Sequence, residues 1–290
     1  AERLDGLPLA LEQAAAYIVH TQISFAEYLA EWERESEAVL GWHDEGAMQY
    51  PVPLAVTWQR SFRQLPLTAQ AVLRLASFFA PDPIPVAMLE SGEGIVHRAA
   101  ARLAAESGEE AAPRRVRDDL AELRSLSLIS GQGETFSVHR LMQEVVRNRI
   151  PEERRAAWIR LILEQVHGYA QFQGDDSNTW SSWEVLRSHT AEILGHAAER
   201  GAAENTFASE LMTALGNFLV ARGLLAEAEV LYENALSIET RLLDEKISSL
   251  KARRTNLQGK RDEVAEVGAI GDVQRDDSLP LRVLAGDEPE

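Results

Sequence analysis

The sequence predicts a mainly α-helical protein with one small β-hairpin. Apolar residues recur at intervals of three and four over most of the 290 residues, which is the period of an amphipathic helix. The period changes to that of a strand only around Gly131-Gln132-Gly133-Glu134, where two short β-capable runs flank a glycine-rich turn. The composition, 45% hydrophobic and 26% charged, is ordinary for a globular chain, and the length suggests about two domains.

The first segment is predicted to be a helical hairpin. Residues 7–19 form a helix with Pro8 in its first turn, where the missing N–H of proline costs nothing. A second helix begins at Ser24, which forms a capping box with Glu27 three residues later. The apolar residues expected on one face of this helix are Phe25, Tyr28, Leu29 and Trp32. The glycine- and proline-containing stretch 41–53 is then a loop, and we place the first segment at residues 1–45.

The second segment, residues 53–150, is predicted to be a winged helix. Two helices at 54–65 and 67–79 are separated by Pro66, and residues 84–89 are predicted to form a short helix. A further helix starts at Pro113 and carries its apolar stripe on Val116, Leu120, Leu123 and Leu126. Strand-like runs at 126–130 and 135–138 form the hairpin, and a helix follows over 139–150. Helices followed by a small hairpin and another helix are the order of a winged helix.

The remainder of the chain is predicted to be helical up to a charged tail. Residues 151–206 form a helical linker with two apolar stripes. These stripes are Trp158, Ile159, Ile162 and Val166, and then Trp183, Leu186, Ile193 and Leu194. Residues 207–243 resemble a tetratricopeptide repeat, since Gly216, Gly223, Ala228, Tyr232 and Ala235 have its spacing. Leu219 and Thr240 replace the aromatic residue and the proline of that pattern. Residues 244–290 form a charged tail that is weakly helical over 245–265 and is predicted to be disordered, above all in its last residues.

Composition excludes several classes of function. A net charge of −17 disfavours a general nucleic-acid coat or an anionic-membrane binder, because both depend on basic faces. The absence of cysteine excludes disulfides, thiolate catalysis and cysteine-ligated metal sites. No run approaches about 18 consecutive apolar residues, and the first residues lack a signal-peptide pattern. We therefore expect a cytoplasmic protein without a membrane partner.

The sequence contains no motif of a complete catalytic or metal site. It lacks the phosphate-binding Gly-x-x-x-x-Gly-Lys-Ser/Thr loop, the Gly-x-Gly-x-x-Gly loop and the His-Glu-x-x-His zinc motif. His43-Asp44-Glu45 is expected to be a solvated loop, because adjacent residues do not share a helix face. Ser137 and His139 lack the nucleophile elbow of a hydrolase. We expect the chain alone not to be an enzyme.

Two short motifs carry a family resemblance. Gly6-Leu7-Pro8-Leu9 at the start of the first helix resembles the Gly-Leu-Pro-Leu motif of NB-ARC proteins, which are signal-transduction ATPases of the STAND class. Val138-His139-Arg140 stands in the place of that family's Met-His-Asp motif, with valine and arginine at its flanks. The resemblance implies that Pro8 packs on the adenine of a bound nucleotide. It also implies that His139 donates a hydrogen bond to the β-phosphate of ADP.

The resemblance extends from residue 1 to about residue 243 and implies which parts of the protein would bind nucleotide. Residues 1–45 would be a helical remnant of the NB-ARC domain. The phosphate-binding loop, its lysine and the acidic magnesium ligand would lie before residue 1. ADP or ATP is therefore expected only in the context of a complete NB-ARC domain, and no cofactor is expected for this chain alone.

The expected function is that of a regulatory and protein-interaction segment of a signalling switch. The resemblance implies an ADP-held closed state, a protein partner bound through the helical repeat, and possible oligomerisation of an activated longer form. One alternative is a tetratricopeptide adaptor that does not depend on nucleotide.

A second alternative is a winged-helix transcriptional regulator with Arg114, Arg115 and Arg117 on its recognition helix. The same segment carries carboxylates at Asp118, Asp119 and Glu122, so a salt-bridged solvated face is favoured over nucleic-acid binding. Trp180 and Trp183 are expected to belong to the core rather than to an interface.

Overall fold

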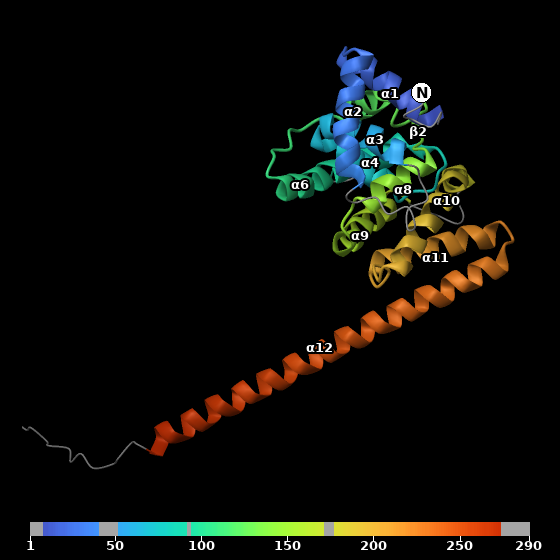
Figure 1. Ribbon diagram of the computed structural model, residues 1–290. Helices are drawn as coiled ribbons and strands as arrows, with labels where there is room; N and C mark the ends of the chain where they lie inside the picture. The colour runs from blue at the N-terminus through green and yellow to red at the C-terminus, as the bar shows by residue number, and fades with distance from the viewer. Residues whose placement is uncertain (1–7, 41–51, 92–93, 171–176, 274–290) are drawn as a thin grey trace, which may run out of the picture. The chain divides into compact units, whose positions relative to one another are not determined.

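The computed structural model describes residues 8–40, 52–91, 94–170 and 177–273. Within these ranges the chain is mainly helical and has one two-stranded antiparallel sheet, so the predicted fold class is confirmed (Figure 1). The contacts divide the chain into a first unit, residues 1–239, and a second unit, residues 240–290. The domain limits predicted near residues 45, 150 and 206 all lie within the first unit.

The elements follow one another along the chain in this order. They are α1 (Pro8–Thr21), α2 (Phe25–Leu40), α3 (Val52–Gln64), α4 (Leu67–Ala76), β1 (Ile84–Pro85), α5 (Val86–Glu90), α6 (Ile95–Ser107), α7 (Val116–Ser125), β2 (Thr135–Phe136), α8 (Arg140–Asn148), α9 (Glu152–Tyr169), α10 (Ser177–Glu199), α11 (Thr206–Ala221) and α12 (Leu225–Val273).

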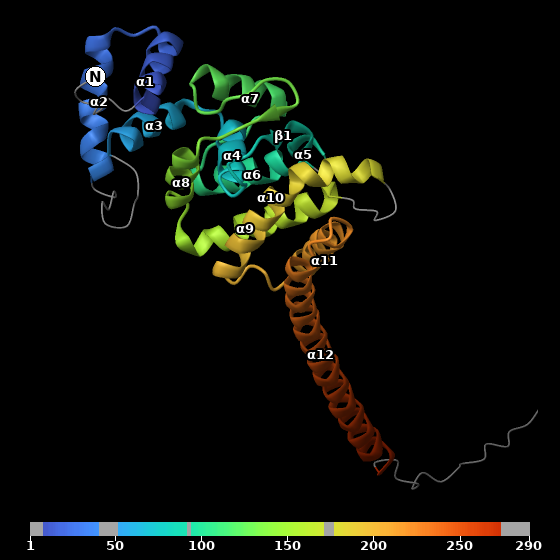
Figure 2. The same cartoon turned by 90° about the vertical axis from the view of Figure 1, so that its right-hand side faces the viewer.

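Helices α1 and α2 both pack on α3 (Figure 2). The predicted capping box is confirmed: the Ser24 amide donates to Glu27 Oε2 over 2.8 Å, and the Glu27 amide donates to Ser24 Oγ over 3.2 Å. The predicted apolar face of α2 is only half buried. Tyr28 and Trp32 are buried, whereas Phe25 and Leu29 are 79% and 41% exposed, because α3 covers a strip narrower than the predicted face.

Helix α4 is enclosed by its neighbours α6, α7 and α8. Six of its residues have no exposed surface, namely Ala69, Ala71, Val72, Leu73, Leu75 and Ala76. The last residue of α4 and the residues just after it are buried, and a buried amide on α8 donates to two of their carbonyls. Gln143 Nε2 donates to the carbonyls of Ala76 and Phe79 over 3.0 and 2.9 Å. In a similar way, Gln165 Nε2 on α9 donates to the carbonyls of Met88 and Ser91 at the end of α5, each over 2.7 Å.

The small sheet corrects two predictions. The helix predicted over 84–89 is wrong at its first two residues, because Ile84 and Pro85 form β1 and pair with Phe136 and Thr135 of β2. Ile84 precedes a proline, and this position disfavours the α conformation. The hairpin predicted between 126–130 and 135–138 is reduced to one bridge between Ser130 and Ser137.

The helices on either side of the residue 108–115 segment also differ from the sequence analysis. The helix predicted from Pro113 begins at Val116 instead, with Arg115 in extended conformation at its N-cap. Helix α6 was not predicted at all, although its apolar residues Ile95, Val96, Ala99 and Leu103 are buried at helical spacing.

The two apolar stripes of the linker are confirmed. Trp158, Ile159, Ile162 and Val166 of α9 and Trp183, Leu186, Ile193 and Leu194 of α10 are all buried. Trp183 stacks on Phe218 of α11 with ring centroids 6.0 Å apart, so its assignment to the core is confirmed. Trp180 is half-buried.

Helices α11 and α12 form the hairpin that resembles a tetratricopeptide repeat. A Cβ atom at Gly216 would lie 2.8 Å from Tyr232 Cε1, so the aromatic ring occupies the space that a side chain would need. Gly223 has a φ of +77° in the turn between the helices, a conformation that favours glycine. Ala228 and Ala235 are buried, in keeping with their positions in the pattern.

The weak helical pattern over 245–265 is confirmed, and disorder predicted for the tail is wrong for residues 244–273, which continue α12 without a break. The repeat pattern has a proline where this chain has Thr240, and a proline inside a helix removes a hydrogen bond and clashes with the preceding turn. Threonine permits the helix to continue. The charged side chains of this segment therefore lie on an exposed helix.

We predict that Gly216→Ala destabilises the protein by about 1 to 3 kcal/mol, because the added methyl group overlaps the Tyr232 ring. Gly195→Ala in α10 is the matched control, since a Cβ there meets nothing within 4 Å. The control should gain about 0.5 to 1 kcal/mol from the lower backbone entropy of alanine. Urea unfolding of both variants measures the difference. Equal stability of the two variants would contradict the close approach.

Candidate functional site

Pro8 and His139 lie at the amino ends of two helices. Pro8 is the first residue of α1 and is exposed. Gly6 and Leu7 of the same motif lie outside the described residues. His139 is the exposed N-cap of α8, and its Nδ1 accepts a hydrogen bond from the amide of Leu141 over 3.2 Å. An accepting Nδ1 carries no proton, so the neutral ring has its proton on Nε2 and can donate from that atom.

The structure does not join these two residues to each other. No hydrogen bond, ion pair or ring contact connects Pro8 and His139 within the part of the chain that the structure describes. Helix α1 instead contacts the end of α7. Gln13 Nε2 donates to the carbonyl of Ser127 over 3.4 Å, and His20 Nδ1 lies 3.3 Å from Ser125 Oγ. Gln13 is a polar residue on the buried side of α1, and this feature of the sequence could have indicated such a contact.

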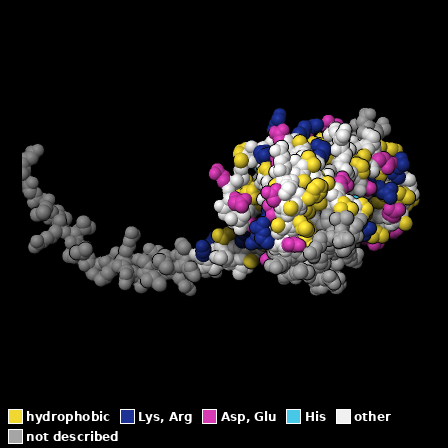
Figure 3. Space-filling view, turned by 45° about the horizontal axis from the view of Figure 1, so that its top comes forward, with side chains coloured by type: hydrophobic (Ala, Val, Ile, Leu, Met, Phe, Trp, Pro, Cys, Tyr) yellow, Lys and Arg dark blue, Asp and Glu magenta, His cyan; other side chains and the backbone are white. Residues whose placement is uncertain are grey.

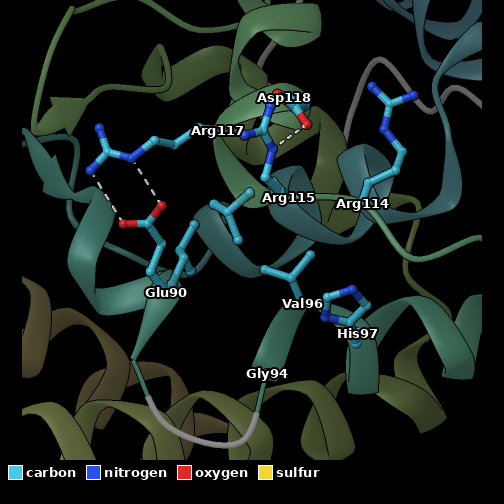
Figure 4. Close-up of a pocket in the computed structure, with 10 residues that line it drawn as sticks. Glu90, Gly94, Val96, His97, Arg114, Arg115, Arg117 and Asp118 are labelled. Atoms are coloured by element: carbon cyan, nitrogen blue, oxygen red, sulfur yellow. Dashed lines mark hydrogen bonds and ion pairs between the residues drawn. The ribbon is translucent and has the colours of Figure 1, made fainter.

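Three arginines precede and begin α7, at the edge of a cavity of about 540 Å³ (Figure 4). Gly94, Val96 and His97 at the start of α6 line the same cavity. The arginines are those considered for DNA reading in the sequence analysis: Arg114, Arg115 and Arg117.

Each of the three guanidinium groups is paired with carboxylates of this chain. Arg114 Nε lies 2.9 Å from Asp119 Oδ1, and Arg114 Nη2 lies 2.9 Å from Glu122 Oε2. Arg115 makes two hydrogen bonds of 2.9 Å to Asp118. Arg117 bridges elements far apart in sequence. It lies 3.0 Å from Glu90 at the end of α5 and 3.0 Å from Glu134 before β2.

The carboxylates respond to these pairs in two ways. Hydrogen bonds from Arg115 and Arg117 hold the pKa values of Asp118 and Glu134 below the ordinary range. Asp119 differs because burial raises its pKa, although Thr68 and Arg114 both donate to its Oδ1. The arginines are thus neutralised locally, and acidic and basic side chains are interspersed on the face in Figure 3. The predicted salt-bridged face is confirmed.

A second depression lies on the α11–α12 hairpin and has a volume of about 440 Å³. We call it the hairpin groove. Its lining residues are Val220, Leu225, Ala228, Glu229, Tyr232, Glu233 and Leu236. Val220 and Leu225 are 44% and 63% exposed, so apolar surface faces outward here. Tyr232 donates from its hydroxyl to Asn217 Oδ1 over 2.6 Å, which holds its ring in place in the lining of the groove.

Within the described ranges, no three histidine, aspartate or glutamate side chains gather in a way that could hold a metal ion. His43, Asp44 and Glu45 lie outside those ranges. None of the described helices has the length and apolar character needed to cross a membrane.

Comparison with known protein families gives a match over part of the chain. Residues 60–155 are similar to a family model described as a domain of unknown function (DUF7779). The match begins in α3 and ends in α9, so it contains the arginine cluster and His139 but neither Pro8 nor the hairpin groove. No curated protein matches the chain.

We predict that replacing Arg114, Arg115 and Arg117 together with alanine leaves any DNA retention unchanged, because their charge is already balanced by neighbouring carboxylates. Electrophoretic mobility shifts at several salt concentrations test this. A sequence-specific, salt-sensitive shift that the triple variant loses would contradict it and favour a DNA-reading role.

Proposed function

We propose that this chain is the regulatory and protein-interaction segment of a signalling switch of the NB-ARC type. The observation that carries this proposal is the hairpin groove, where exposed apolar side chains surround the ring of Tyr232. Exposed apolar surface rimmed by charge is typical of a site that binds another protein. The proposed partner is therefore a protein that inserts apolar side chains here.

The chemistry of the groove defines the class of partner segment. Val220 and Leu225 offer apolar contacts, and Glu229 and Glu233 stand one helical turn apart on its rim. An amphipathic segment with two or three apolar anchors and flanking lysine or arginine fits this combination.

The switch is proposed to act through the segment over residues 53–150, which we propose is a winged helix. Helix α1 packs on α3 of this segment, and it reaches the end of α7 through two long polar contacts, at Ser125 and Ser127, which are easily exchanged. In a protein with a complete nucleotide-binding domain, His139 would donate from Nε2 to the β-phosphate of ADP and Pro8 would pack on the adenine. We propose no ATP hydrolysis by this chain alone, and we propose a cytoplasmic location.

The nucleotide-independent adaptor is the second candidate. The observation that favours it is the cap made by His139, because this hydrogen bond gives the residue a structural role that needs no phosphate. The winged-helix regulator is disfavoured, since the three arginines before and at the start of α7 are engaged within the chain.

We predict that the full chain selects peptides with apolar anchors and basic flanks from a displayed peptide library. Leu225→Asp should abolish this selection, because it places a charge on the apolar wall of the groove. Val185→Asp is the matched control, since Val185 is a 41% exposed apolar residue on α10 outside the groove. Selection of the same peptides by both variants would contradict the groove as the binding surface.

A second prediction separates the switch from the adaptor. In a chain extended by a complete nucleotide-binding domain, His139→Ala should weaken ADP binding about ten- to a hundredfold, the worth of one charge-assisted hydrogen bond. ATP binding should change less, because the contact exists only in the closed state. Calorimetric titration with both nucleotides measures this. Unchanged affinity for ADP would leave His139 as a cap and favour the adaptor.

A further inference from the structure

The second unit presents an apolar stripe along α12. Leu243, Ile247, Leu250 and Leu257 are 59%, 46%, 54% and 67% exposed. From Leu243 to Arg261 every side chain is exposed, so within the described residues this chain does not cover the stripe. A helix with this much exposed leucine is a surface that needs a partner.

The spacing of the stripe defines the kind of partner. The intervals between its members are four, three and seven residues, which repeat every 3.5 residues. This is the heptad period, in which Leu243, Leu250 and Leu257 occupy d positions and Ile247 an a position. Such a period keeps the stripe facing another helix that winds around it. The next a position is Arg254.

We propose that this segment pairs with the same segment of a second copy of the chain as an antiparallel coiled coil. The two-fold axis passes between Ser248 and Ser249. Ile247 of one copy then lies opposite Leu250 of the other, and Leu243 lies opposite Arg254. The apolar stem of an arginine covers a leucine well while its charge reaches water.

Charge determines the antiparallel direction. A parallel, in-register pair would place Arg254 against Arg254 in the seam and Lys246 beside Lys251 at the flanking g and e positions. The antiparallel pair places Asp244 beside Lys251 of the second copy, twice by symmetry. It retains one repulsive combination, Lys246 with Arg253, and has no like charges facing in the seam.

A second copy fits this surface better than an unrelated helix because the segment is self-complementary. It supplies both the isoleucine and the leucine of its central layers, and both charges of its attractive flanking pairs. Isologous contacts of this kind are the rule in symmetric dimers.

Sedimentation equilibrium of the full chain tests the proposal. The wild-type chain should dimerise, and Ile247→Asp with Leu250→Asp should weaken the dimer by at least about tenfold, since both charges enter the seam. Ala252→Asp is the matched control, because Ala252 is exposed at an outer f position of the same helix. Circular dichroism verifies that all variants keep their helix content. A monomeric wild-type chain, or a dimer that the double variant leaves unchanged, would overturn the proposal.

Distances between spin labels test the direction, and the absence of native cysteine permits single labelled positions. In the antiparallel pair, labels on Ser249→Cys lie close together, whereas labels on Asn256→Cys are displaced by about 22 Å along the axis, from a rise of 1.5 Å per residue. A parallel pair would give equal short distances at both positions and overturn the proposed direction.

Reversing one charge should change the dimer affinity in opposite ways in the antiparallel and the parallel arrangement. Lys251→Glu should weaken the antiparallel dimer, because it places Glu against Asp244 of the second copy, and Asp244→Lys should restore the affinity. In a parallel dimer Lys251→Glu would instead relieve its contact with Lys246 and strengthen association.

Discussion

The fold of the first unit depends on how the carboxyl end of the buried helix α4 is satisfied. Carbonyls at and just beyond a helix end lack their usual helical partners, and Ala76 and Phe79 are both buried here. Gln143 of α8 donates to both, and Arg147 donates to the intervening carbonyl of Ser77. Helix α8 therefore cannot leave α4 without removing the donors to the carbonyls of Ser77 and Phe79 in the core. Because His139 caps that same helix, the position of His139 is fixed by the packing of α4.

Polar groups of the first unit are committed in the same way near α7. Arg117 joins Glu90 to Glu134, so it ties the end of α5 to the turn before β2. An arginine that holds two structural elements together is poorly placed to contact a phosphate backbone as well, because each function requires the same donors. Because of this competition, we propose interaction surfaces on α11 and α12, where apolar side chains are exposed, rather than on α7.

Sequence reasoning succeeded where the cause of a structure is local. The Ser24–Glu27 capping box, the buried stripes of α9 and α10, and the close contact of Gly216 with Tyr232 are all set by residues a few positions or one hairpin apart. It failed where the partner is distant. The partner of β1 is about fifty residues away, and neither Gln143 nor Arg117 shows its acceptors in any short pattern. After residue 243 the charged composition made the helical pattern look weak, although leucine recurs every seven residues there.

Thr240 connects the two surfaces proposed for α12. The repeat pattern ends its second helix with a proline, and a proline at this position would terminate the helix soon after the buried Ile238. With threonine the same helix continues past Glu239, and residues that a terminated helix would leave in a loop acquire a common face. A heptad stripe exists only in a helix, so Leu243, Ile247 and Leu250 become a single surface only because residue 240 is not proline. The departure of Thr240 from the repeat pattern is therefore the feature that allows this chain a second interaction surface.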